Sequence, residues 1–547
     1  MATTPVQPSA LQRAYLVGRD TDTELGGVST HGYFEFVGPP CDPTRLQGAL
    51  DAAIAAHAAL RTGVTGRDLT ISDAPAAFPL VVHDLCGHAD AENIIEKLRV
   101  DQCSVVRQGW PLFGVTLVQE TADRSRLLVD VDGLAVDLGS IRALIEEIHT
   151  RYIGHPIPKV PAGPATAPAT DSGARAWWHK RLPDLPPPPR LVLHQAPAEV
   201  TATRFVGRHH LLPAPVWSAA RDAARCHGIT PTGLALAVFA ETLHRCGAGD
   251  RFTVAAPTRS TSRNGSSIGQ LAGIVPLAVE WSGSDPATRA KMAQRTLMEA
   301  ALHASGAGPE LLADLAREHG LGPTAPLPVV FTSGIGLPGR MAPPGWELAT
   351  LTSQTAGIWL DAQVTEVPDG LMIHWDTVDE CLEDADALFA AHLTLWHAHA
   401  DPAIWQSTEQ REPVRGASWI PLVRPRGPLE ELLAVAWSYA LDVRSLGRDD
   451  DLLALGAGPA SAATCAAWLT DWFGQPVIDA AELASATTVT ALARNLSGAH
   501  PNLPQVAELS LAVAAELDAA PSAVPPIPDF GTDMRFQYCP TSPLETL

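Results

Sequence analysis

The sequence contains little lysine and no cluster of basic residues. Lys and Arg together number 38 against 60 Asp and Glu, so the formal net charge of the 547 residues is −22. Proteins bind nucleic acids and anionic membrane surfaces through clustered Lys and Arg side chains. We therefore expect neither nucleic acid nor membrane as a partner. The four lysines are spread along the chain as Lys97, Lys159, Lys180 and Lys291.

Paired cysteines and long apolar segments are also missing. The eight cysteines are widely separated, with no C-x-x-C pair and no metal-ligand spacing to histidine, so we interpret them as reduced thiols without a metal. No apolar run approaches the roughly 18 residues that cross a bilayer. The N-terminus MATTPVQPSALQRAY lacks the basic and then apolar segments of a secretory signal. These absences predict a cytoplasmic protein.

What is present is the composition of a soluble globular protein, with 46% hydrophobic and 18% charged residues. The length suggests about three or four domains. Residues 155–174, HPIPKVPAGPATAPATDSGA, are rich in Pro, Ala and Gly and show no periodicity. We interpret them as a linker between two lobes. A second linker is expected at Trp419–Gly427.

A strand, a turn and a helix follow one another in residues 127–152. The apolar run Leu127–Val131 is typical of a buried strand, and Asp132-Gly133 is a turn signal that ends it. Apolar residues then recur at helical spacing, with Asp137 or Ser140 at the expected N-cap. Such turn and cap residues are common without any chemistry, so taken alone this pattern favours a structural role.

Two further segments have a local interpretation. Thr332–Gly339, TSGIGLPG, contains a G-x-G-x-x-G pattern, but Pro338 and the MAPPG that follows exclude the helix that a dinucleotide site requires. We therefore predict an irregular loop. Farther on, WLDAQVTEV and LMIHWDTV are separated by Pro368-Asp369-Gly370, which predicts a β-hairpin.

Taken together, these motifs resemble the heterocyclization domains of nonribosomal peptide synthetases. The pattern Asp-x-x-x-x-Asp-x-x-Ser between the strand and the helix matches the signature of that family. The segments VVFTS, TSQT and WLD match later motifs, and LQRAYLVGR matches the opening one. The resemblance covers about residues 8–415. Its matching positions are Gln12, Ala14, Tyr15, Gly18, Arg19, Asp132, Asp137, Ser140, Thr332, Ser353, Gln354, Thr355 and Asp361.

The resemblance implies an α/β fold of two chloramphenicol-acetyltransferase-like lobes, arranged as a V-shaped pseudodimer with the active site in a tunnel between them. We expect residues 1–160 to form the first lobe and residues 175–415 the second. In the family, donor and acceptor carrier proteins dock at opposite ends of the tunnel. Each inserts a 4′-phosphopantetheine arm that carries a substrate as a thioester. The chain itself is expected to bind no cofactor and no metal.

The family's chemistry assigns roles to particular residues here. A Cys, Ser or Thr side chain attacks a newly formed amide, water leaves, and a thiazoline or oxazoline results. The resemblance assigns this cyclodehydration to Thr332 and Asp361, because a shielded carboxyl group with an orienting hydroxyl can move the protons. Asp132 and Asp137 are also candidate catalytic residues, although as turn and cap residues we expect them chiefly to hold the tunnel's shape. Motif positions with a structural role are Ser140, Tyr15, Arg19, Ser353, Gln354 and Thr355.

Departures from the family pattern leave alternatives open. The usual Ser-Gln-Thr-Pro-Gln continues here as Ala356-Gly357, and the usual Gly-Asp-Phe-Thr-Ser reads Gly-Gln-Leu-Ala-Gly at 269–273. Either change could alter substrate choice or abolish one step. The alternatives are a condensation or acyl-transfer enzyme without ring closure and a non-catalytic scaffold. The nucleophile, whether Cys, Ser or Thr, and the acyl donor are not determined.

Residues 428–497 resemble a peptidyl carrier protein. In that family a serine after Leu-Gly-Gly opens a helix and carries phosphopantetheine, but alignment on Leu455-Gly456 places Pro459 at the serine position. Ser461 lies two residues farther on, roughly 200° around a helix. We predict a degenerate carrier that is never loaded, and hence an enzyme that acts in trans on other synthetase subunits. Residues 498–547 are predicted to be a flexible tail with one short helical stretch.

Overall fold

The structure is a computed structural model that describes most of the chain. The described residues are 3–73, 77–157, 170–191, 193, 195, 197–260, 268–281, 285–318, 327–382, 384–406, 425–441, 446–448, 452, 457–473, 476 and 478–516. Leu455-Gly456, most of the second linker and residues 517–547 of the expected tail lie outside them.

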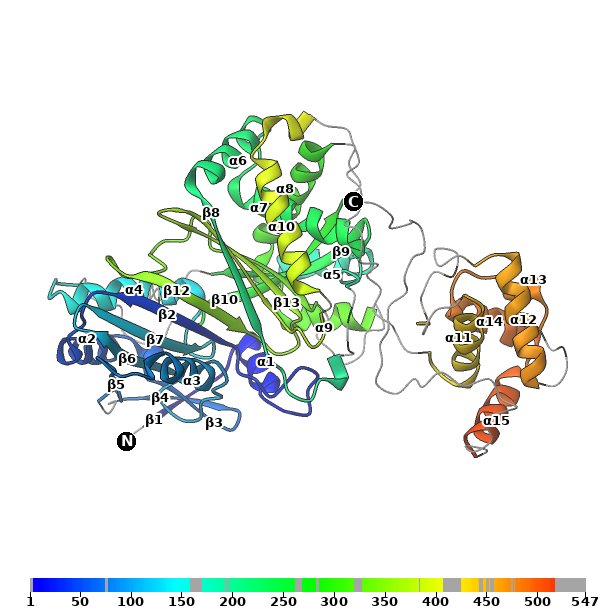
Figure 1. Cartoon of the computed structure of the whole chain (residues 1–547), viewed down its shortest axis with the longest axis horizontal. Helices are drawn as coiled ribbons and strands as arrows, with labels where there is room; N and C mark the ends of the chain where they lie inside the picture. The colour runs from blue at the N-terminus through cyan, green and yellow to red at the C-terminus, as the bar shows by residue number, and fades with distance from the viewer. Residues whose placement is uncertain are drawn as a thin grey trace.

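The first lobe is a five-stranded sheet with helices on both faces (Figure 1). Alternate strand residues such as Phe34 and Val131 form a core with α2 and α4, while Tyr33 and Leu128 on the opposite face pack against α3. The sheet order is β12-β2-β7-β6-β5, and β1, β4 and β3 form a small separate sheet. The bounds are β1 Thr3–Val6, α1 Ala10–Gly18, β2 His31–Gly38, α2 Pro43–Ala56, β3 Thr62–Thr65, β4 Asp68–Ser72, β5 Val81–Asp84, α3 Ala91–Cys103, β6 Phe113–Thr121, β7 Arg124–Asp132 and α4 Leu138–Tyr152.

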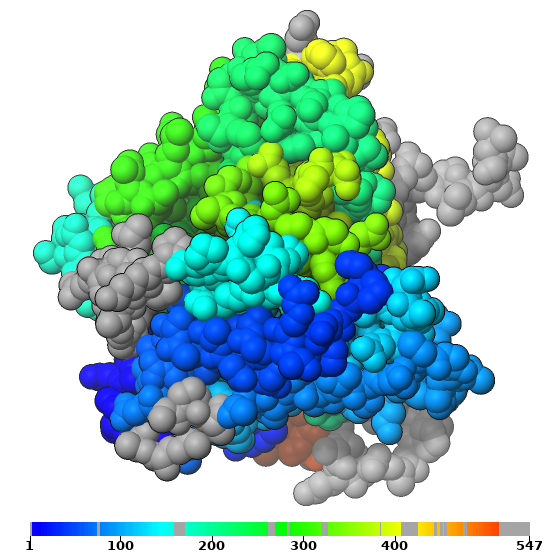
Figure 2. Space-filling model, turned by 90° about the vertical axis from the view of Figure 1, so that its left-hand side faces the viewer, coloured from blue at the N-terminus to red at the C-terminus, as the bar shows by residue number. Residues whose placement is uncertain are grey.

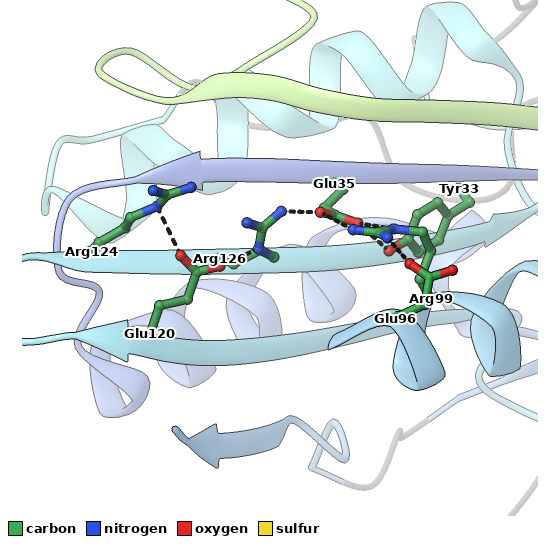
Figure 3. Close-up of polar contacts among 7 residues, drawn as sticks. All are labelled: Tyr33, Glu35, Glu96, Arg99, Glu120, Arg124 and Arg126. Atoms are coloured by element: carbon green, nitrogen blue, oxygen red, sulfur yellow. Dashed lines mark hydrogen bonds and ion pairs between the residues drawn. The ribbon is translucent and has the colours of Figure 1, made fainter. Parts of the chain in front are cut away.

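Charged residues hold α3 to its face of this sheet (Figure 3). The fully buried carboxylate of Glu35 accepts two hydrogen bonds from Arg99, both 2.8 Å, and one of 2.9 Å from the hydroxyl of Tyr33. Arg126 forms an ion pair with the same carboxylate. Burial alone would raise the pKa of Glu35, but these partners outweigh it and lower that pKa. The network therefore keeps a buried charge paired.

The second lobe is a six-stranded sheet covered on one face by helices (Figure 1). Its central helix α7 begins after the N-cap Thr230 with Pro231 in its first turn, a residue pair that favours a helix start. The predicted hairpin is confirmed, since β13 and β14 pair antiparallel around residues 368–369. The sheet order is β10-β9-β11-β13-β14-β8. The bounds are α5 Ser172–Arg181, β8 Val206–Pro213, α6 Ala214–Cys226, α7 Pro231–Leu243, β9 Arg251–Arg259, β10 Ala272–Glu280, α8 Pro286–Leu302, α9 Pro309–Glu318, β11 Val329–Ser333, β13 Leu360–Val367, β14 Gly370–Thr377 and α10 Ala385–His399.

One strand crosses from the second half of the chain to the first lobe. Strand β12, Glu347–Gln354, pairs antiparallel with β2 and forms an edge of the five-stranded sheet. The range 175–415, expected to form only the second lobe, therefore contributes a strand to the first. The pairing occupies the backbone groups of β2 that would otherwise form an open sheet edge. It also lays β12 along the junction of the lobes (Figures 1 and 2).

A third body, the α-helical bundle, consists of α11 Pro428–Ala440, α12 Pro459–Phe473, α13 Ala480–Leu483, α14 Val489–Ala499 and α15 Leu503–Glu516. Figure 1 shows it apart from the two lobes. Leu503 and Ala507 of α15 are buried in its core, so the bundle continues past the boundary expected at residue 497. Burial of these side chains against the bundle, including α11, explains why this part of the expected tail is folded. No helix in the described part of the chain is long and apolar enough to span a membrane.

Candidate functional site at the junction of the lobes

Thr332 and Asp361 come together on neighbouring strands of the second lobe. Strand β11 runs parallel to β13, with Val330 opposite Asp361. The Thr332 hydroxyl donates a hydrogen bond of 2.9 Å to Asp361 Oδ1. The two residues that the family resemblance selected are thus direct partners, although 29 positions separate them.

The surroundings of Asp361 make its carboxyl group an unusual acid. Burial, and then the negative charge of Asp376, raise the pKa of Asp361 from 3.8 to about 7. Hydrogen bonds from Thr332 and Ser353 and the charge of His374 act in the opposite direction. A carboxyl group with a pKa near 7 can release and accept a proton at neutral pH, which is the property that general acid–base catalysis requires.

Three further residues of this site were missed by the sequence reasoning. Asp376 lies directly opposite Asp361 on the hairpin, and His374 lies opposite Gln363. His374 Nε2 donates to Asp376 Oδ2 at 2.8 Å, while Gln363 Nε2 lies 3.1 Å from Asp361 Oδ2 and 3.0 Å from Asp376 Oδ2. A signal was present: polar residues at alternate positions of two otherwise apolar strands share one sheet face.

Ser353 reaches this cluster from β12. Its hydroxyl lies 2.9 Å from Asp376 Oδ2 and 3.3 Å from Asp361 Oδ2, and its backbone N–H donates to Asp376 at 2.9 Å. Because β12 belongs to the sheet of the first lobe, the site takes residues from both sheets. Its neighbour Gln354 is buried opposite His31, and Thr355 lies half-buried just after the strand.

The departures at 356 and 357 have a structural account. Gly357 has a φ of +78°, a left-handed conformation that favours glycine. Ala356 lies against α1, where a Cβ added at Gly18 would be 2.5 Å from its own Cβ. Helix α1 therefore approaches this turn too closely for a larger side chain at position 18. The other departure, Gln270, donates from its side chain to the carbonyl of Gly133 at 2.8 Å and so links the two lobes.

Asp132 has structural partners. Its carboxylate forms a buried ion pair with Arg19 and accepts a hydrogen bond of 2.9 Å from the backbone N–H of Leu134. The first contact ties α1 to the end of β7, and the second holds the turn. Burial raises the pKa of Asp132 against the attraction of Arg19. The Asp132 carboxylate is thus engaged in structural contacts with Arg19 and Leu134, and not with Asp361.

Asp137 and Ser140 connect the lobes. Asp137 caps α4 by accepting from Ser140 N at 2.8 Å, and it also accepts from Leu271 N at 3.0 Å and from Arg259 Nε at 3.1 Å. The Ser140 hydroxyl lies 2.8 Å from the carbonyl oxygen of Gly269 and 3.0 Å from its N–H. Since Arg259, Gly269 and Leu271 belong to the second lobe, these contacts fix the start of α4 against it (Figure 2).

A second link between the two lobes starts from Arg142 on α4, two residues after Ser140. The guanidinium of Arg142, buried on α4, donates to the carbonyl oxygens of Gly334, Leu337 and Gly339 at 3.3, 3.0 and 2.8 Å. These carbonyls belong to the irregular loop predicted for the G-x-G-x-x-G segment, and the structure confirms that no helix starts there. This loop of the second lobe therefore binds the guanidinium group of Arg142, which belongs to the first lobe.

Tyr15 lies near Asp132 and Asp137 of the first lobe and near Asp361 of the second. Burial and then the charges of Asp137, Asp361 and Asp132 raise the pKa of its hydroxyl, which therefore stays protonated. Its ring packs beside Gly133, where an added Cβ would be 3.4 Å from Tyr15 Cε2. The opening motif thus places a neutral phenol at the junction of the lobes.

An apolar pocket borders the cluster. It takes side chains from α4, from β12 and the loop before it, and from β13 and β14, so both lobes contribute to it. Gln363, Thr365 and His374 form its polar part. The lining residues are Leu138, Met341, Leu348, Leu351, Gln363, Thr365, Val367, Met372 and His374.

In the α-helical bundle, Pro459 is the first residue of α12. The hydroxyl of Ser461 accepts a hydrogen bond of 2.8 Å from Gly458 N and lies 3.1 Å from the carbonyl oxygen of the same residue. The only serine near the start of this helix is thus engaged with its backbone.

Comparisons with known proteins agree with this architecture. No protein-family model matches the chain. The chain is 34% identical over 433 residues to the phenyloxazoline synthase MbtB of Mycobacterium sp. (strain MCS), covering 74% of this chain and 36% of that protein. It is 30% identical over 444 residues to the pyochelin synthetase PchF of Pseudomonas aeruginosa, covering 75% and 24%. The chain therefore spans about a third or less of these two relatives.

Among solved structures, the EpoB cyclization-docking bidomain from Sorangium cellulosum superposes with a TM-score of 0.66 at 23% identity, over 74% of this chain and 87% of that one. The first condensation domain of the calcium-dependent antibiotic synthetase gives 0.57 at 18% identity, over 73% and 97%. These likenesses confirm the expected fold of two chloramphenicol-acetyltransferase-like lobes. The fold and the sequence relatives together show that the two-lobed part of the chain belongs to the condensation and heterocyclization domains of nonribosomal peptide synthetases, a family of enzymes.

Proposed function

We propose that this chain joins an acyl thioester to a Cys, Ser or Thr thioester and then closes the amide to a thiazoline or oxazoline. The observation that carries the proposal is the Asp361 carboxyl group, which has a pKa of about 7 and a hydrogen bond to Thr332. Amide formation alone does not require a carboxyl group that both gives and takes protons at neutral pH. Ring closure does.

In the first step, the amine of the acceptor attacks the thioester carbon, the C–S bond breaks, and the proton lost by nitrogen leaves with the thiol. In the second step, the side-chain thiol or hydroxyl attacks the new amide carbon while its proton passes to Asp361. The former carbonyl oxygen takes protons and departs as water, and the nitrogen loses its proton to form the C=N bond. The ring-closing step therefore releases one molecule of water.

Thr332 orients the carboxyl group during these transfers. Its hydroxyl donates to Asp361 Oδ1, and we propose that Oδ2, which lies 3.3 Å from Ser353 Oγ and 3.1 Å from Gln363 Nε2, exchanges the proton. Asp361 is half-buried, and the surrounding protein limits its contact with bulk water. Asp132, Asp137, Ser140 and Arg19 act by holding α1, α4 and the second lobe together around the site.

The substrates are proposed to arrive on phosphopantetheine arms of donor and acceptor carrier proteins. Pro459 has no hydroxyl, and the hydroxyl of Ser461 is bound to Gly458. We infer that the α-helical bundle presents no substrate, so that both thioesters come from other carriers. One relative is a phenyloxazoline synthase, which makes a benzoyl thioester a reasonable first donor to test.

The test separates the two steps. Full-length protein is given N-benzoylcysteinyl or N-benzoylseryl pantetheine thioester, in which the amide already exists, and loss of one water is followed by mass spectrometry. A parallel reaction starts from benzoyl pantetheine with cysteinyl or seryl pantetheine. Asp361→Asn and Thr332→Val are expected to accumulate the open amide. Thr116→Val, which also removes the hydrogen bond of a buried threonine but in the first lobe, is the matched control.

Each outcome distinguishes the alternatives. Amide formation without water loss by the wild type would favour a condensation enzyme without ring closure. No product from the wild type, on pantetheine or on loaded carrier proteins, would favour a scaffold. Ring closure that survives Asp361→Asn unchanged would overturn the proposed role of this carboxyl group.

A further inference from the structure

We propose that His374 and Asp376 are positioning residues that change the proton affinity of Asp361 in opposite directions. Hydrogen bonds of Ser353 and Gln363 connect Asp376 to the Asp361 carboxyl group. This inference rests on the proposed function, because it concerns the same acid–base group.

The hydrogen bonds around Asp376 show how the two carboxyl groups are connected. Asp376 Oδ2 accepts from His374 Nε2, Ser353 N, Ser353 Oγ and Gln363 Nε2, at 2.8, 2.9, 2.9 and 3.0 Å. Ser353 Oγ and Gln363 Nε2 also lie within 3.3 Å of Asp361 Oδ2. The Ser353 hydroxyl has one proton, so it can serve only one carboxylate at a time. When Asp361 gives its proton to the substrate, this hydroxyl can turn from Asp376 to the new carboxylate.

The charges act in opposite directions. Asp376 is a like charge and disfavours ionisation of Asp361, whereas His374 favours it to a smaller extent. Burial opposes the charged form of His374, but the charge of Asp376 and its hydrogen bond raise the pKa of the imidazole, with a contribution from Asp361. The pair therefore leaves Asp361 balanced between its two forms near neutral pH.

Other titratable groups also lie near the cluster. Burial raises the pKa of Cys103 on α3 to about 12 and keeps Tyr15 on α1 protonated. On β8, His209 lies opposite His374, and burial together with the charges of His374 and His210 lowers its pKa. From β12 and β11 the cluster receives Ser353 and Thr332, which are neutral. The lowered pKa of His209 favours its neutral form beside His374.

The test measures the protonation of Asp361 directly. The full-length protein is titrated without substrate from pH 5 to 9, and the infrared carboxyl band of Asp361 is isolated by subtracting the spectrum of Asp361→Asn. Asp376→Asn is expected to lower the midpoint by about one pH unit or more, and His374→Gln to raise it. The acid limb of the rate of ring closure of N-benzoylcysteinyl pantetheine should move in the same two directions.

His210→Gln is the matched control. It lies next to His209 on β8 but opposite Ile373, so its side chain belongs to the other face of the sheet, and it should leave both midpoints unchanged. Equal midpoints in wild type, Asp376→Asn and His374→Gln, with folding verified by circular dichroism, would overturn this inference. If Asp376→Asn does not fold, the upward shift in His374→Gln still decides it. Failure of the proposed function would instead appear as ring closure unaffected by Asp361→Asn.

Discussion

The raised pKa of Asp361 predicts that replacing this residue stabilises the protein in mildly basic solution. In the unfolded chain the carboxyl group ionises near its ordinary pKa of 3.8, whereas in the folded protein it ionises only near 7. Below 3.8 both states are protonated, so no penalty exists. Between these values only the unfolded state loses its proton, and the stability falls as the pH rises. Above about 7 the loss is complete.

The magnitude follows from the two pKa values. Each unit corresponds to about 1.4 kcal/mol, so the carboxylate costs on the order of 4 kcal/mol at pH 8. In Asp361→Asn, the new amide group would face the Gln363 amide, which lies 3.1 Å from Asp361 Oδ2, and this donor conflict offsets about 1–2 kcal/mol. We expect a net stabilisation of about 2–3 kcal/mol at pH 8 and none at pH 4.5, together with loss of ring closure.

Thermal unfolding of the full-length protein, followed by circular dichroism at pH 4.5 and pH 8, measures the change in stability caused by Asp361→Asn. The transition of the two-lobed unit should rise by a few °C in Asp361→Asn at pH 8 only. The matched control is Asp130→Asn. Burial opposes ionisation of Asp130, but nearby His31 and the hydrogen bonds and charge of Arg107 lower its pKa, so its replacement should destabilise the protein at pH 8. A lower transition temperature for Asp361→Asn at pH 8 would refute the argument.

Three more predictions follow from the structure. Asp137→Asn should lower the stability by about 2–4 kcal/mol and reduce every activity in parallel, because Arg259 loses a buried anionic partner; urea unfolding measures it, and selective loss of ring closure would contradict it. Thr332→Val should slow ring closure by about 10²-fold while amide formation continues, since only orientation of Asp361 is lost; single-turnover assays show it, and an equal loss in both steps would argue against it. Incubation with a phosphopantetheinyl transferase and coenzyme A should leave the intact mass of the chain unchanged, whereas Pro459→Ser provides the hydroxyl that could be loaded; a phosphopantetheine-sized gain in the wild type would disprove the degenerate carrier.

Much of the local structure could be predicted because its causes are adjacent in the sequence. Thr230 and Pro231 start α7, residues 368–370 turn the hairpin, and Asp137 caps α4 through the N–H of a residue three positions away. The pairing of Thr332 with Asp361 came from the family resemblance, and the structure supplies its geometry. Periodicity alone could not have selected these two residues among the polar residues of the same strands.

The tertiary structure decided what depends on residues that are distant in the sequence. It placed β12 in the sheet of the other lobe and thereby brought Ser353 to Asp361 and Asp376, and it buried part of α15 in the α-helical bundle. The sequence by itself determined the turns, the caps and the family, and it led to Thr332 and Asp361 as the proposed acid–base pair. The proton affinity of Asp361 is set by burial and by the charges of Asp376 and His374 on the same hairpin, and by hydrogen bonds from Thr332 and Ser353, of which Ser353 comes from the sheet of the other lobe.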